Sequence, residues 1–185
     1  AADTLDMAYS WSNGAAGTET TLDGSLAPGD TLTCTATITD GTDSVTASAD
    51  ALLENRDPAL ADIAISPAAP ASSTEVVCTA TAEDPDGGAL DIAYAWTDAT
   101  GAPLGNEANL ALDPGTVQPT AVLTCTATIT DPQGAFITAT ATATVENTAP
   151  EISLVSITPE APVSGETAEC AAVAEDADGE TPVLS

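Results

Sequence analysis

The stretch Thr124-Cys125-Thr126-Ala127-Thr128-Ile129-Thr130-Asp131 decides the fold of this chain. Its apolar residues alternate with threonine, so Cys125, Ala127 and Ile129 share one side of an extended segment and the threonines share the other. Such a period of two predicts a half-buried β-strand. The same octapeptide occurs earlier as Thr33–Asp40. Because the identity extends over eight residues at an offset of 91, from Cys34 to Cys125, it predicts an internal repeat.

Short alternating segments, separated by turn-forming residues, fill the chain on both sides of this stretch. Leu90, Ile92, Tyr94 and Trp96 alternate in the central part, and the turn signal Asp131-Pro132-Gln133-Gly134 precedes an Ala/Thr alternation. No helical period is apparent. About seven short strands in each repeat of roughly 91 residues predict an all-β fold of β-sandwich repeats.

The spacing of the cysteines predicts where the repeats begin and end. Cys170 follows Cys78 by 92 residues, and Glu54–Pro58 and Glu146–Pro150 have the composition of linkers. These positions predict one complete domain, 56–147, between the C-terminal part of a domain, 1–55, and the N-terminal part of another, 148–185. We expect the chain to be a window from a longer tandem array, or a subunit whose split domain is closed by a neighbour.

The charge of the chain excludes several classes of function. It carries a formal net charge of −28, with 29 acidic residues, one basic residue (Arg56) and no histidine. Such a chain is unsuited to nucleic acid, whose phosphates require Lys and Arg, and favours cations instead. The sequence contains no run of about 18 apolar residues, so we expect no membrane insertion in this segment. The chain has no histidine or lysine, and its acidic pairs cluster in turns rather than converging on a pocket, so we expect no enzyme and no catalytic residues.

The order Cys78…Trp96…Cys125 in the central domain resembles the immunoglobulin-like (Ig-like) sandwich. The resemblance implies a disulfide between Cys78 and Cys125 that joins two sheets and packs against Trp96, with Trp11 as the corresponding core residue of the first domain. The alternative is a pair of buried free thiols. Cys34 and Cys170 would then pair with cysteines outside this copy of the chain, on neighbouring repeats or neighbouring molecules.

In such a sandwich, acidic and amide side chains of the loops gather near the linker that precedes the domain. Oxygen ligands in flexible loops suit Ca²⁺, and the linkers resemble cadherin-type junctions, in which an acidic residue and Asn precede Pro. The alternative is that Asp-x-Asp-Gly is only a turn-forming sequence. No other cofactor is expected. The candidate Ca²⁺ ligands are Glu54, Asn55, Asp57, Asp84, Asp86, Asp131, Glu146, Asn147, Asp176 and Asp178.

The chain as a whole resembles bacterial tandem Ig-like surface-protein repeats of the PKD and cadherin-like kind, through its Tyr-x-Trp segments, the repeated strand and the Asp-x-Asp-Gly loops. The resemblance implies an extracellular or cell-surface location and a structural role, as a segment of a filament or stalk stacked head to tail on neighbouring copies or repeats. The alternative is an adhesin or accessory module that binds carbohydrate or protein through loops. Residues 97–120, which include the extra residues of the central domain, are the candidate binding loop.

Overall fold

The computed structural model describes residues 5–22, 26–181 and 183, and the described residues form strands and loops without a helix. The remaining residues, which fall in the predicted first and third domains, lie outside the described residues. The chain separates into two compact units, Ala1–Ala59 with Ala82–Asp91 and Ile129–Ile137, and Leu60–Thr81 with Ile92–Thr128 and Thr138–Ser185. Among the described residues no helix is long and apolar enough to cross a membrane.

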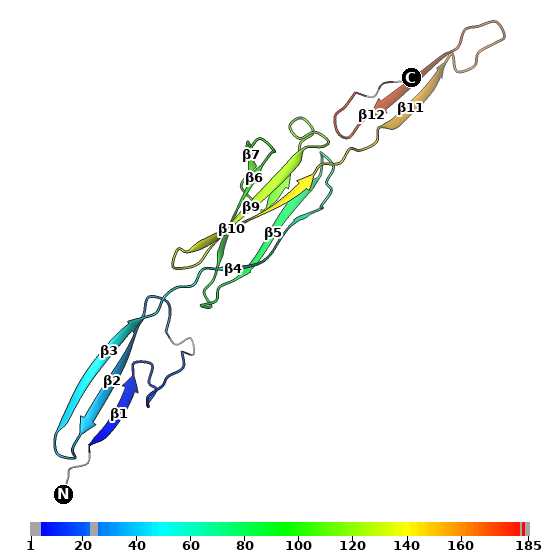
Figure 1. The fold of residues 1–185 in the computed structure, drawn as a ribbon. Coiled ribbons are helices and arrows are strands. Elements are labelled where there is room, and N and C mark those ends of the chain that lie inside the picture. The colour runs from blue at the N-terminus through cyan, green and yellow to red at the C-terminus, as the bar shows by residue number, and fades with distance from the viewer. Residues whose placement is uncertain (1–4, 23–25, 182, 184–185) are drawn as a thin grey trace. The chain divides into compact units, whose positions relative to one another are not determined.

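The first sheet has three antiparallel strands in the order β1-β2-β3. They are β1 (Asp6–Trp11), β2 (Thr31–Thr39) and β3 (Ser44–Leu52), and they lie side by side as one layer in Figure 1. Strand β2 contains all of the first copy of the octapeptide except its last residue, Asp40, which begins the turn. The turn into β3 passes through Gly41 at a φ of 92°, a conformation that glycine adopts without steric cost.

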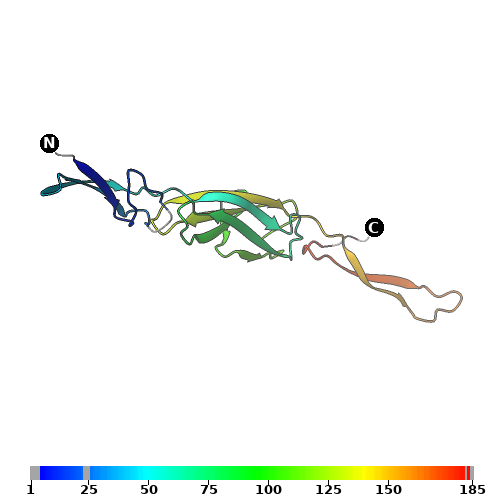
Figure 2. The same cartoon turned by 90° about the horizontal axis from the view of Figure 1, so that it is seen from below.

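Two further sheets form the central, sandwich-like part of the fold, which Figure 2 shows from a second direction. One sheet has the order β4-β5-β8 and the other β10-β9-β6-β7. Their strands are β4 (Ala59–Ser66), β5 (Glu75–Glu83), β6 (Asp91–Thr97), β7 (Pro103–Gly105), β8 (Asn109–Ala111), β9 (Val122–Thr130) and β10 (Phe136–Thr144).

The core of this part takes residues from both sheets. Val76 and Cys78 of β5 pack with Trp96 of β6 and with Leu123 and Cys125 of β9, and all five side chains are fully buried. On β9 every second residue is buried, in the period of two that the sequence predicted. The alternation therefore gives this sheet one apolar side, and the apolar sides of the two sheets make one core.

A two-stranded antiparallel hairpin, β11 (Glu151–Thr158) and β12 (Glu169–Glu175), follows the sandwich. All eight residues of β11 are exposed, although half of them are apolar. The predicted all-β class is confirmed, and the fold contains several antiparallel sheets. The domain boundaries at 55/56 and 147/148 stay a prediction.

Candidate functional site

A disulfide between Cys78 and Cys125 joins strand β5 of one sheet to strand β9 of the other. The two Cα atoms are 6.5 Å apart and the cysteines are separated by 47 residues in sequence. Trp96 is fully buried in the same core, and its indole Nε1 donates a hydrogen bond of 2.9 Å to the carbonyl of Glu107. The disulfide therefore closes a long loop within an apolar core in which the one polar atom of Trp96 is satisfied.

The other two cysteines have free thiols. Cys34 is half-buried on β2, directly opposite Trp11 of β1, and Cys170 is exposed on β12, opposite Ile157. The indole Nε1 of Trp11 donates to the carbonyl of Gly17 at 3.0 Å, so its polar atom is satisfied as in Trp96. Trp11 itself is only half-buried.

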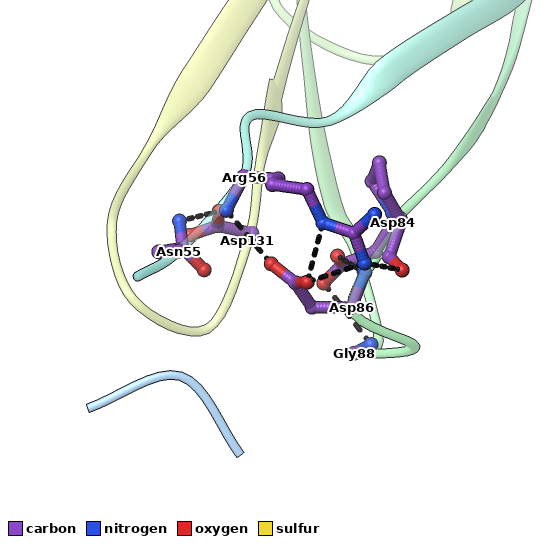
Figure 3. A network of polar contacts seen from close by, with 7 residues as sticks. Asn55, Arg56, Asp84, Asp86, Gly88 and Asp131 are labelled. Carbon is purple, nitrogen blue, oxygen red and sulfur yellow. Dashed lines mark hydrogen bonds and ion pairs between the residues drawn. The ribbon is translucent and has the colours of Figure 1, made fainter. Parts of the chain in front are cut away.

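Arg56, the one basic residue of the chain, binds the loop that contains Asp86. Figure 3 shows its side chain reaching across to this loop. The backbone N–H of Arg56 donates to Asp86 Oδ2 at 2.7 Å, its Nε donates to Asp86 Oδ1 at 2.8 Å, and its guanidinium also donates to the carbonyl of Pro85. Both carboxylate oxygens of Asp86 are thus occupied by a single residue of the linker.

Asn55, next to Arg56, binds the loop that follows β9. Its Nδ2 donates to Asp131 Oδ2 at 2.7 Å, as Figure 3 shows, while Asp131 Oδ1 accepts from the backbone N–H groups of Gln133 and Ala135, each at 2.9 Å. Asp131 is buried, so these hydrogen bonds replace those to water that its carboxylate loses on folding. Together, Asn55 and Arg56 attach the linker to two different loops.

Asp178 forms the corresponding contact around the second linker. It is fully buried; its Oδ1 accepts from the hydroxyl of Ser72 at 2.6 Å, and its Oδ2 accepts from the backbone N–H of Thr148. Asp86 and Asp178 occupy the same place in their Asp-x-Asp-Gly loops, and each binds a backbone N–H of the linker that precedes its loop in the sequence. The two linkers therefore use one type of contact.

Hydrogen bonds lower the pKa of each of these three carboxyl groups below its usual value. The amide of Asn55 is the main cause for Asp131 and the hydroxyl of Ser72 for Asp178, with backbone N–H groups adding to both. For Asp86 the backbone N–H of Arg56 contributes most, followed by the Arg56 side chain. Donors that bind the ionised form favour it, so these groups stay negatively charged in the folded protein.

The remaining candidate Ca²⁺ ligands are more dispersed. Asp84 and Asp176 accept hydrogen bonds from backbone N–H groups of their own loops. Gly88 lies so close to Asp84 that a Cβ on it would sit 2.4 Å from Asp84 Oδ2, so the loop needs glycine there. The side chain of Asn147 donates to the carbonyl of Thr148. Glu54, Asp57 and Glu146 are exposed.

Protein donors bind the central carboxylates among the proposed Ca²⁺ ligands. Ca²⁺ takes six to eight oxygen ligands, whereas the oxygens of Asp86, Asp131 and Asp178 already accept hydrogen bonds from protein groups. Asn55 Oδ1 is the one buried side-chain atom without a partner that we find in the described part of the chain. No group of three or more Asp, Glu, Cys or His side chains among the described residues is arranged to hold a metal ion. Ca²⁺ binding stays a prediction from the sequence, and the ion would have to displace these protein donors.

Two residues of these contacts were not among the sequence candidates. Arg56 interrupts the acidic pattern of the first linker, and its value as a partner for Asp86 depends on the loop being folded beside it. Ser72 lies in the unpatterned run Ala71-Ser72-Ser73 and is 106 residues from Asp178, so no local signal identifies it.

Comparison with protein-family models and with curated proteins finds no match for this chain.

Proposed function

We propose that this chain is a structural segment of an extracellular filament or cell-surface stalk, built from Ig-like sandwich repeats that are stapled by disulfides and stacked head to tail. The observation that carries the proposal is the disulfide between Cys78 and Cys125, which joins the two sheets of the central domain. Disulfides persist in oxidising surroundings, which is the condition outside cells. A covalent link between sheets also limits how far a domain extends when its ends are pulled.

The linker contacts support the same role. A linker whose backbone and side chains are bound to the next domain transmits a pull into that domain instead of extending first. Arg56 and Asn55 provide such contacts at the first linker, and Thr148 with Asp178 provides one at the second. The charge of −28 keeps neighbouring filaments apart by repulsion and favours solubility.

Single-molecule force spectroscopy on the full chain tests this proposal. With the disulfide closed, the segment between Cys78 and Cys125 cannot extend. At a maximum of about 3.6 Å per residue, opening the disulfide adds about 170 Å to the length released when the central domain unfolds. The double variant Cys78→Ser/Cys125→Ser is the matched control and should release the full length without a reducing agent. Extension of the central domain without a resolvable unfolding force would refute a structural role under tension.

A second candidate function is binding through the loops of the central domain. A cavity lined by Asp98, Leu104, Val117 and Leu123 lies in the part of the chain that contains the extra residues of this domain. Asp98 is held there by hydrogen bonds from Thr100 and from the backbone N–H of Ala102 at 2.9 Å. A glycan array probed with the full chain, with Asp98→Ala as control, tests this function. Binding that the substitution leaves unchanged would exclude the cavity as the site.

A further inference from the structure

One face of the sheet β1-β2-β3 carries apolar side chains that are exposed. Opposite residues of neighbouring strands share a face, and the register places Met7 opposite Ile38 and Ile38 opposite Val45. Val45 is 72% exposed and Met7 56% exposed. An apolar sheet face of this kind is normally buried against another element, because a single layer cannot form a core.

The sandwich shows what the same sequence does when it is covered. Leu32–Asp40 and Leu123–Asp131 are identical in sequence. Ile129 is 0% exposed, whereas its counterpart Ile38 is 37% exposed. On the covered strand, Cys125 is joined to Cys78 of the β4-β5-β8 sheet. In the sandwich, therefore, β4 and β5 belong to the sheet that covers this sequence.

The hairpin β11–β12 has residues that correspond to those of β4 and β5. Ile157-Thr158-Pro159 corresponds to Ile65-Ser66-Pro67 of β4 and the loop that follows it, and Cys170 corresponds to Cys78 of β5, each at an offset of 92 residues. The matching residues again differ in exposure, as Ile129 and Ile38 do: Ile65 in the sandwich is 9% exposed and Ile157 in the hairpin is 54% exposed. The hairpin thus has residues that match those of β4 and β5, and its apolar side chains, like those of the first sheet, are exposed.

The hydrogen-bonded pair Asn55 and Asp131 of the sandwich also has corresponding residues beside the hairpin and the first sheet. In the sandwich, Asn55 of the preceding linker binds Asp131 at the end of the repeated strand. Asn147 holds the position of Asn55 in the second linker, and Asp40 holds the position of Asp131 after β2. Neither has the other as a partner: Asn147 donates to the carbonyl of Thr148, and Asp40 accepts from Thr42 and Asp43.

We propose that the β11–β12 hairpin of one copy of this chain covers the apolar face of β1-β2-β3 of a second copy, as β4 and β5 cover the other sheet within the sandwich. This inference rests on the proposed function and names its partner. The interface between the sheets of the sandwich serves as its template, and this places Cys34 beside Cys170 and Asp40 beside Asn147. Because each copy has one face of each kind, the contact joins copies head to tail in an open chain.

The cysteine link forms by thiol–disulfide exchange with a low-molecular-weight disulfide such as oxidised glutathione. The thiolate of one cysteine attacks a glutathione sulfur and releases one glutathione thiol. The thiolate of the other cysteine then attacks the mixed disulfide and releases the second. The net step converts two protein thiols and one glutathione disulfide into one protein disulfide and two glutathione thiols, so the electrons balance.

The test uses the full 185-residue chain in glutathione redox buffer, followed by gel electrophoresis without reductant and by peptide mapping. Copies of this chain repel one another through their charge, so the buffer contains enough salt to screen it. We expect a ladder of dimers, trimers and longer species linked through Cys34 and Cys170, with the link between Cys78 and Cys125 retained within each copy.

Single substitutions separate this geometry from random oxidation of exposed thiols. Cys34→Ser alone and Cys170→Ser alone should each stay monomeric, and a mixture of the two variants should stop at the dimer. Asn147→Ala, which keeps every cysteine, should lower the linked fraction about tenfold at early times, as loss of a hydrogen bond to a charged group would.

Three results would overturn the proposal: symmetric links between two Cys34 or two Cys170 residues, a link between Cys34 and Cys170 within one monomer, or no link at all. None of these results would alter the force at which the central domain unfolds. Failure here is therefore distinguishable from failure of the structural role.

Discussion

The disulfide between Cys78 and Cys125 should supply a large part of the stability of the sandwich. We consider Cys78→Ala/Cys125→Ala in a background in which Cys34 and Cys170 are serine, so that no other thiol exchanges. Closing a loop of 47 residues removes about 13–14 cal/mol/K from the unfolded chain in the loop-entropy model, or about 4 kcal/mol at 25 °C. Three buried positions of the same core, Ala80, Ala127 and Ala143, are alanine, which buries little apolar area, so these positions add little stability beside the disulfide.

The measurement is thermal and guanidinium unfolding of the two chains, followed by the fluorescence of Trp96. Trp11→Phe in both chains removes the second tryptophan signal. For a domain of this size, a loss of about 4 kcal/mol should lower the Tm by about 20 °C. A loss below about 1 kcal/mol, with the unfolding transition still cooperative, would refute the loop-entropy argument and with it the view of the disulfide as the main staple.

Further predictions concern the core, the linker and metal ions. Leu123→Ala should destabilise the central domain by about 3 kcal/mol because it leaves a cavity in a fully buried site, whereas Leu32→Ala at the half-buried matching position should cost less in the monomer, as urea unfolding would show. Asp178→Asn should lower the free energy of unfolding at pH 7, because the Asp178 carboxylate accepts hydrogen bonds from Ser72 and Thr148. Since the pKa of Asp178 is lowered in the folded state, the wild type keeps this advantage above about pH 4 and loses it as the pH falls further. Equal pH dependence of stability in the two chains would contradict the assignment. Excess chelator should leave the Tm unchanged, because protein donors already occupy the carboxylates at both linkers; a fall of several degrees that added Ca²⁺ reverses would show that the acidic loops bind the ion after all.

The strands of this protein could be predicted because their signal is local. The alternation of threonine with apolar residues in β9 determines which side chains face the core, and Asp-Gly or Asp-Pro sequences end the strands at turns. The inward position of Cys125 follows from the same alternation. Each of these inferences requires only a few consecutive residues.

The contacts of the linkers could not be predicted in the same way. From residue type alone, we predicted that the acidic residues form a Ca²⁺ site. The structure instead places Arg56 and Asn55 against two different loops and leaves Glu54 and Asp57 exposed. A carboxylate takes whichever donor lies nearest, and the nearest donor depends on how the loops fold. Residue type and spacing do not contain that distance.

By itself, the sequence determined that this protein is all-β, where the repeated strand lies and which of its side chains face inward, because a period of two acts over neighbouring residues. Only the tertiary structure decided which copy of that strand is buried. Leu32–Asp40 and Leu123–Asp131 are identical, yet Ile129 is covered and Ile38 is partly exposed. The physical reason is that burial belongs to a pair of surfaces: one sheet presents an apolar face, and a second sheet must be present to remove it from water.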